Sequence, residues 1–91
     1  MSVQAVFDAL KYRIEVDDDG SRLYYNTNGE LHRSNGPAVE WHNGVKFWYH
    51  NDRLHRTGGP AVEWANGHKE WWINGVILTE AEFNQAVKQY E

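Results

Sequence analysis

The chain has 91 residues, no cysteine and a formal net charge of −4 at pH 7. This length allows one small domain, and the lack of cysteine excludes disulfides and thiolate metal sites. The negative charge argues against general nucleic-acid binding, and no apolar run approaches the roughly 20 residues that span a bilayer. The first residues also lack the pattern of a secretory signal. We therefore expect a cytoplasmic protein with no membrane span.

Residues 1–12 are expected to form an N-terminal cap. Val3, Val6, Phe7 and Leu10 recur at a spacing of three to four residues, which is typical of one apolar face of a helix. Because no obvious capping residue precedes them, this helix is predicted from periodicity alone.

Residues 13–78 contain an internal repeat. The block 31–41 returns as 54–64, and the offset between His32 and His55 is 55 − 32 = 23 residues. A fixed period of this length is typical of repeat proteins, whose units bury apolar surface by stacking on their neighbours. We therefore expect the duplicated residues to lie in neighbouring rows of one scaffold.

Asn-Gly and Asp-Gly pairs divide this region into β-hairpins. A first set of turns lies at residues 19–20, 43–44 and 66–67, and a second set lies at residues 28–29, 51–52 and 74–75. The Asn-Gly turns are expected to be of type I′, with positive φ at both central residues. An offset of 24 upstream of the duplicated block indicates a one-residue insertion, or bulge, at Thr27. The predicted fold is mainly β, an antiparallel meander that forms one elongated single sheet.

The turn at residues 43–44 sets the expected register. A two-residue loop there places Val39 opposite Trp48, and Trp41 opposite Lys46. The equivalent pairs in the next hairpin are Val62 with Trp71 and Trp64 with Lys69. Each lysine is then expected to lie over a tryptophan ring in a cation–π contact.

Residues 79–91 are expected to form a C-terminal helix that caps the sheet. Thr79 and Glu82 match a capping box, in which each residue binds a backbone N–H near the other. The apolar stripe of this helix consists of Phe83, Ala86, Val87 and Tyr90.

The motif Tyr-x-(x)-Asn-Gly-x-x-His, with a period of 23 residues, resembles MORN (membrane occupation and recognition nexus) repeats. The resemblance runs from about Arg22 to Ile77 and is best over residues 48–55. It departs from the family at Arg33 and Arg56, where glycine is usual. The resemblance implies stacked hairpins in an elongated sheet. The variant Leu-His-Arg-x-x-Gly-Pro-Ala is similar to short repeat proteins of bacteriophages and large DNA viruses, which implies a viral source.

Two His-Arg pairs and four tryptophans are the candidate binding residues: His32, Arg33, His55, Arg56, Trp41, Trp48, Trp64 and Trp71. An arginine fork binds phosphate or carboxylate in a bidentate manner, and tryptophan rings stack on bases. The competing interpretation, which we favour, is structural. Arg33 and Arg56 then pair with Glu40 and Glu63, and the histidines pack on aromatic rings and bind backbone carbonyls.

Metal binding and catalysis are not expected. The five histidines are spread along the chain without the close pairing of a zinc site, and no cysteine nucleophile is present. The acidic run at residues 17–19 lacks the spacing of a Ca²⁺ loop. We expect no enzyme activity and no cofactor.

Three functions remain open. The leading hypothesis is a non-enzymatic binding module, encoded by a phage, that captures a host protein and interferes with a bacterial defence or regulatory system. The first alternative is a sponge that sequesters a small anionic nucleotide. The second is a structural or assembly protein of a viral particle. A homodimer that buries one sheet face is compatible with each of them.

Overall fold

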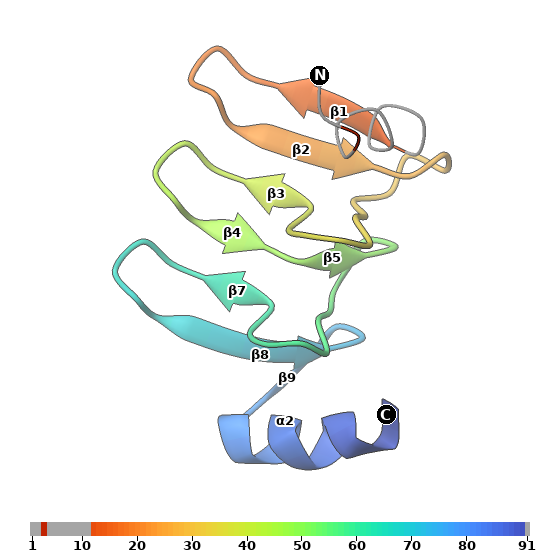
Figure 1. Ribbon diagram of the computed structural model, residues 1–91, viewed down its shortest axis with the longest axis vertical. Coiled ribbons are helices and arrows are strands. Elements are labelled where there is room, and N and C mark those ends of the chain that lie inside the picture. Colours follow the sequence, from red (N-terminus) through yellow and green to blue (C-terminus); the bar gives the residue numbers. More distant parts are fainter. Residues whose placement is uncertain (1–2, 4–11, 91) are drawn as a thin grey trace.

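The computed structural model describes residue 3 and residues 12–90. Within them, seven strands form one open antiparallel sheet in the order β1-β2-β3-β4-β7-β8-β9 (Figure 1). The strands are β1 (Arg13–Val16), β2 (Arg22–Tyr25), β3 (Val39–Glu40), β4 (Lys46–Phe47), β5 (Tyr49–His50), β6 (Arg53–Leu54), β7 (Val62–Glu63), β8 (Lys69–Ile73) and β9 (Val76–Leu78). The mainly β, antiparallel fold is confirmed. The expected N-terminal helix falls outside the described residues, apart from Val3.

The expectation of one single sheet is wrong in one respect. Strands β5 and β6 pair with each other in a separate two-stranded sheet, through Tyr49 with Leu54 and His50 with Arg53. After β6 the chain makes a loop over residues 56–60 before β7 begins, and β7 then pairs with β4 instead of β6. The loop therefore displaces the second hairpin from the main sheet.

The turn at residues 43–44 is not of type I′. Gly44 has a φ of 92°, but Asn43 is not among the described residues with positive φ. The N–H of Gly44 binds the carbonyl of Trp41 at 3.0 Å, and the N–H of Trp41 binds the carbonyl of Val45 at 2.9 Å. This pattern is a three-residue loop that ends in a left-handed glycine. The loops that contain Gly20 and Gly67 have the same hydrogen bonds and similar φ values of 91°.

The second set of turns has a different backbone conformation. Asn51 and Asp52 have φ values of 50° and 66°, and Asn74 and Gly75 have values of 47° and 82°, so both turns have the positive φ pair of type I′. The turn that contains Thr27 instead has three loop residues, closed by the N–H of Asn26 on the carbonyl of Glu30 at 2.9 Å. The insertion at Thr27 therefore lengthens a two-residue loop.

The three-residue loops shift the register by one residue. Val39 pairs with Phe47 and Glu40 pairs with Lys46, so the expected pairs of Val39 with Trp48 and of Trp41 with Lys46 are wrong. In the next hairpin Val62 pairs with Glu70 and Glu63 with Lys69. The expected pairs of Val62 with Trp71 and of Trp64 with Lys69 are therefore wrong as well. A one-residue shift moves every side chain to the other face of a strand. The register therefore decides which residues share a surface.

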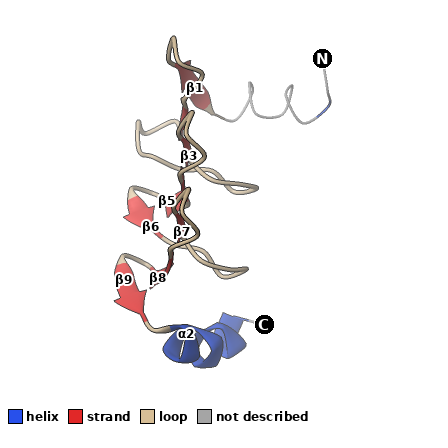
Figure 2. Ribbon diagram, turned by 90° about the vertical axis from the view of Figure 1, so that its left-hand side faces the viewer, coloured by secondary structure: helices blue, strands red, loops and turns tan. Residues whose placement is uncertain are grey.

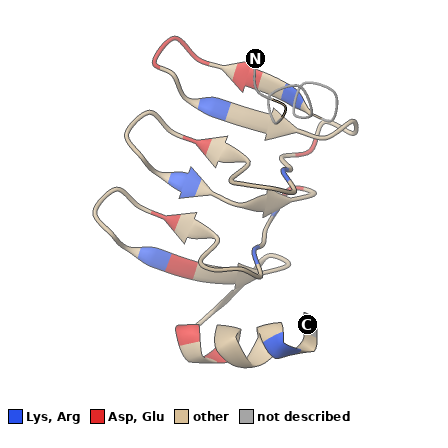
Figure 3. Ribbon diagram, in the orientation of Figure 1, with Lys and Arg blue, Asp and Glu red and all other residues tan. Residues whose placement is uncertain are grey.

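One row across the sheet alternates in charge. Its members are paired in succession across five strands and are Arg22, Glu40, Lys46, Glu63 and Lys69. Figure 3 shows this row as alternating blue and red segments on β2, β3, β4, β7 and β8. Opposite charges that face each other across strands stabilise a sheet by roughly 0.2–1 kcal/mol per pair, and a register slip of one residue would lose them.

The side of the sheet that carries the neighbouring row is rich in aromatic rings. Phe47 and Trp64 form an edge-to-face contact with ring centroids 5.9 Å apart, and Phe47 lies 6.5 Å from Tyr49. Val39 and Val62 lie in the same row and are buried. We call this side the aromatic face, and its rings are those of Tyr25, Trp41, Phe47, Tyr49, Trp64 and Trp72.

The C-terminal helix α2 (Glu80–Val87) is followed by a 3-10 turn, η1 (Lys88–Tyr90). The capping box is confirmed. The side chain of Thr79 accepts the N–H of Glu82 at 3.1 Å, and the carboxylate of Glu82 accepts the N–H of Thr79 at 2.8 Å. Phe83 is buried, which fits the expectation that this helix packs against the end of the sheet.

Replacing Thr79 by alanine removes one half of the capping box. We expect Thr79→Ala to lower the free energy of unfolding by about 1 kcal/mol, because a helix N–H loses its acceptor. Thr79→Ser keeps the hydroxyl and is expected to retain most of that stability. Urea denaturation followed by circular dichroism measures both, and equal losses for the two variants would contradict the assigned role of the hydroxyl.

Candidate functional site

Arg33 fastens the first Gly-Pro loop to the sheet. Its guanidinium lies 4.0 Å above the ring centroid of Tyr24, and its Nη1 donates to the carbonyl of Pro37 at 3.3 Å. The same nitrogen forms an ion pair with Glu40 at 3.1 Å. A Cβ atom at Gly36 would lie 3.0 Å from this nitrogen, so a larger residue there would have to displace the guanidinium. One side chain thus connects the loop, the strand and a buried ring.

Arg56 repeats these contacts in the second copy. Its guanidinium lies 3.9 Å above the Trp48 ring, and its Nη1 binds the carbonyl of Pro60 at 3.0 Å and Glu63 at 3.3 Å. The side chain of Arg56 is 29% exposed, compared with 13% for Arg33. The expected pairing of the arginines with the glutamates is confirmed. The cation–π partners are arginines, not the lysines expected from the two-residue register.

The two histidines connect neighbouring hairpins. Nδ1 of His32 accepts the backbone N–H of Asn51 at 3.1 Å, and Nδ1 of His55 accepts that of Asn74 at 2.9 Å. In both contacts the turn directs an N–H toward the ring, and the expected bonds to backbone carbonyls stay a prediction. His50 lies between them, with ring centroids 4.5 Å from His32 and 5.7 Å from His55.

Burial favours the neutral form of His55. Loss of solvent lowers the pKa of His55 below its usual value of 6.5, and the nearby His50 lowers this pKa further. The unprotonated form is the one that can accept the N–H of Asn74 at Nδ1. The hydrogen bond and the direction of the pKa shift therefore favour the same neutral state.

An open pocket lies between the two Gly-Pro loops. Its volume is about 600 Å³, and it is lined by Arg33, Ser34, Asn35, Gly36, Trp48, Tyr49, His50, His55, Arg56, Thr57 and Gly58. We call it the inter-loop pocket. Of the candidate residues it brings together Arg33, Trp48, His55 and Arg56. The remaining candidates, which do not line it, are His32, Trp41, Trp64 and Trp71.

The lining of the inter-loop pocket contains basic residues and no acid. Two arginines and two histidines line it, and no Asp or Glu is among the lining residues. Glu40 and Glu63 bind the arginines from the sheet without lining the pocket. The acids that offset the arginine charges therefore lie outside the pocket wall.

The four candidate tryptophans separate into different environments. Trp48 lies beneath the guanidinium of Arg56, so this face of its ring is not available for stacking on a base. Trp41 and Trp64 are on the aromatic face and are 39% and 42% exposed. Trp71 is half-buried in β8. The expectation of one common strip with the His-Arg pairs is therefore not met by all four rings.

Sequence reasoning missed Tyr49, His50 and the loop residues of the pocket. His50 directly precedes the turn at residues 51–52, and a tight turn brings it close to the chain segment that follows. The position of His50 beside a turn could therefore have marked it as a site residue from the sequence. The approach of His50 to His32 was not readable, because it depends on how one hairpin packs on the next.

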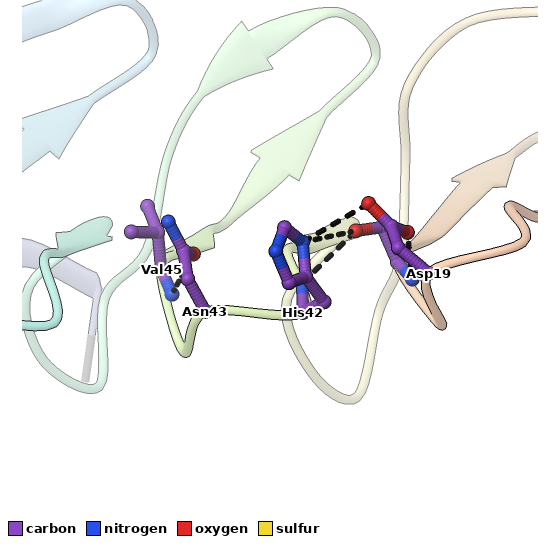
Figure 4. A network of polar contacts seen from close by, with 5 residues as sticks. Asp19, His42, Asn43 and Val45 are labelled. Carbon is purple, nitrogen blue, oxygen red and sulfur yellow. Dashed lines mark hydrogen bonds and ion pairs between the residues drawn. The ribbon is translucent and has the colours of Figure 1, made fainter.

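A second polar network joins the hairpin loops at the other end of the strands (Figure 4). Nδ1 of His42 lies 3.0 Å from the carboxylate of Asp19, and the backbone N–H of His42 binds the hydroxyl of the buried Ser21 at 2.9 Å. The N–H and hydroxyl of Ser21 lower the pKa of Asp19, and His42 contributes to this effect. In Figure 4, Asn43 binds only its own loop at Val45, so this network ends there.

Comparisons with known proteins assign no family to the chain, since no family model, curated protein or solved structure matches it. Among the described residues, no helix is long and apolar enough to cross a membrane. In the same part of the chain, no three His, Asp or Glu side chains are grouped so that they could hold a metal ion.

The unequal burial of the two arginines predicts that their removal lowers the free energy of unfolding by unequal amounts. We expect Arg33→Ala to lower the free energy of unfolding by about 1–2 kcal/mol, since a half-buried ion pair and a cation–π contact are both lost. Arg56→Ala, at the more exposed site, should lose less. Arg53→Ala at an exposed position of β6 serves as the control. Denaturant titration of the three variants tests this order, which equal losses at all three positions would contradict.

The lowered pKa of His55 predicts acid sensitivity. Because its folded-state pKa lies below the unfolded value of about 6.5, its contribution is fully present above that pH and is lost as pH falls toward the folded pKa. His55→Asn removes the titration and keeps a side-chain acceptor. We expect the urea midpoint of the wild type to fall more steeply than that of His55→Asn below pH 6.5. Parallel pH profiles would show that His55 does not contribute.

Proposed function

We propose that the protein is a non-enzymatic binding module that captures another protein on its aromatic face. The observation that carries this proposal is the exposure of two large rings on one sheet surface, Trp41 at 39% and Trp64 at 42%. Half-buried rings lie beside them on this face. Exposed aromatic side chains in such a group are typical of the residues that dominate binding energy at protein interfaces.

The charges around the aromatic face favour a basic partner. Glu15 and Glu70 stand at the two ends of the row that contains Phe47. Arg13, which lies 4.3 Å over the Tyr25 ring of the same face, pairs with Glu15 at 3.7 Å. The pKa of Glu70 is lowered, first by the indole N–H of Trp72, which donates to it at 3.0 Å. Since the whole chain carries −4, we infer a partner whose apolar patch is bordered by lysine or arginine.

The repeat architecture and the viral origin belong to this proposal. The two copies of the duplicated block form the same arginine contacts, which supports a MORN-like array with a period of 23 residues. The resemblance to short phage and viral repeat proteins supports a target in a bacterial host. We propose that binding interferes with a defence or regulatory protein of that host, in the host cytoplasm.

The proposal is tested by affinity capture from bacterial lysate with quantitative mass spectrometry. We expect one basic host protein at a stoichiometric level with the wild type, and at least about tenfold less with Trp41→Ser/Trp64→Ser. Val16→Ser/Val76→Ser is the matched control, because these side chains are 61% and 59% exposed and their strand partners, Arg22 and Ile73, belong to the opposite face.

Folding and self-association are measured on the same variants. Circular dichroism must show that the tryptophan variant keeps its fold, and the captured protein must bind the purified chain directly in a titration. Equal capture by the wild type and the tryptophan variant would reject the aromatic face as the binding surface. Sedimentation that shows a wild-type dimer, lost in the tryptophan variant, would instead assign this face to a homodimer.

A further inference from the structure

The inter-loop pocket lies on the loop side of the sheet and has no role in the proposed capture of a protein. In the edge-on view of Figure 2, long loops project on the side of α2, while β6 and β9 lie on the other side. Arg33 and Arg56 stack on Tyr24 and Trp48, whose positions alternate with those of the aromatic face along the strands. The pocket therefore requires its own explanation.

Arg56 has N–H donors that can bind an anion. Within the described part of the chain, its hydrogen bonds are made by Nη1 alone, to Pro60 and Glu63. Its Nε and Nη2 retain N–H donors, while the ring of Trp48 holds the guanidinium in place. An arginine that is already fixed loses little side-chain freedom when it binds a phosphate in a bidentate manner.

The rest of the lining matches a phosphate ester that carries a ring. Ser34, Asn35 and Thr57 place hydroxyl and amide groups around the opening, and the imidazole rings of His50 and His55, whose centroids lie 5.7 Å apart, add aromatic surface. No carboxylate lines the pocket to repel an anion. The volume of about 600 Å³ is in the usual range for small-molecule sites.

We propose that the inter-loop pocket binds one nucleotide-sized phosphate ester, with its phosphate on Arg56 and its base against the imidazole rings of His50 and His55. The site needs two adjacent copies of the Gly-Pro loop, and the duplicated block occurs twice. In the third position Leu78 and Thr79 replace the His-Arg pair and lead into α2. The stoichiometry is therefore one ligand per chain.

Isothermal titration calorimetry of the full chain with adenosine 5′-monophosphate, ribose 5-phosphate and inorganic phosphate tests the site. We expect binding at one equivalent with the nucleotide, and at least about tenfold weaker binding with the other two probes. Equal affinity for inorganic phosphate would overturn the assignment of a base subsite. No heat with the nucleotide at millimolar concentration would overturn the proposal as a whole.

The matched variants are His50→Glu and Gln85→Glu. His50 is exposed, and the first variant places a carboxylate in the pocket wall at the loss of its ring contacts with His32 and His55. The second adds the same charge on the exposed side of α2, and circular dichroism of both variants must show that the fold is kept. We expect His50→Glu to weaken nucleotide binding at least about tenfold and Gln85→Glu to leave it within about twofold. Equal binding by both variants would overturn the site.

The Trp41→Ser/Trp64→Ser variant should bind nucleotide as the wild type does, which separates this site from protein capture.

Discussion

The position of the Gly-Pro loops depends on one arginine contact that occurs twice. In each copy a guanidinium stacks on a ring of the sheet, binds the carbonyl of the loop proline and pairs with a glutamate on the strand that follows. A short strand of two residues has few hydrogen bonds of its own. The arginine therefore supplies much of what keeps each loop against the sheet and keeps the pocket between the loops open.

This contact also explains the unusual composition of the duplicated block. Glycine gives the guanidinium its room, because a Cβ at Gly36 or Gly59 would approach it to 3.0 or 3.3 Å and push it from its place. Proline supplies a carbonyl at the turn, and the alanine that follows is fully buried in both copies, at Ala38 and Ala61. The motif His-Arg-x-x-Gly-Pro-Ala is thus accounted for as a structural unit before any ligand is considered.

The two faces of the sheet differ because the arginines use only one of them. On the loop side, rings and cations are paired with each other and leave a polar pocket. On the other side, Trp41 and Trp64 have no such cover and remain partly exposed. A thin sheet of this size cannot bury both faces with its own residues. Its uncovered face is where we place a protein partner, and its covered face is where we place a small anion.

The histidines that connect neighbouring hairpins also lie at or near the inter-loop pocket. His32 and His55 each accept a backbone N–H from the next turn, and this role alone accounts for their presence in both copies. The same packing brings His50 and His55 to the wall of the pocket. A residue kept for its contact with a neighbouring hairpin thereby becomes available to an anion that enters between the loops.

The sequence by itself determined the mainly antiparallel β fold, the positions of the turns, the capping box at Thr79 and the pairing of Arg33 and Arg56 with glutamates. These features depend on local chemistry or on a short separation along the chain. Only the tertiary structure decided the register and the faces, because Asn-Gly closes loops of two or three residues and the length of the loop shifts each strand by one. The inter-loop pocket likewise exists only when two loops that are 23 residues apart lie side by side.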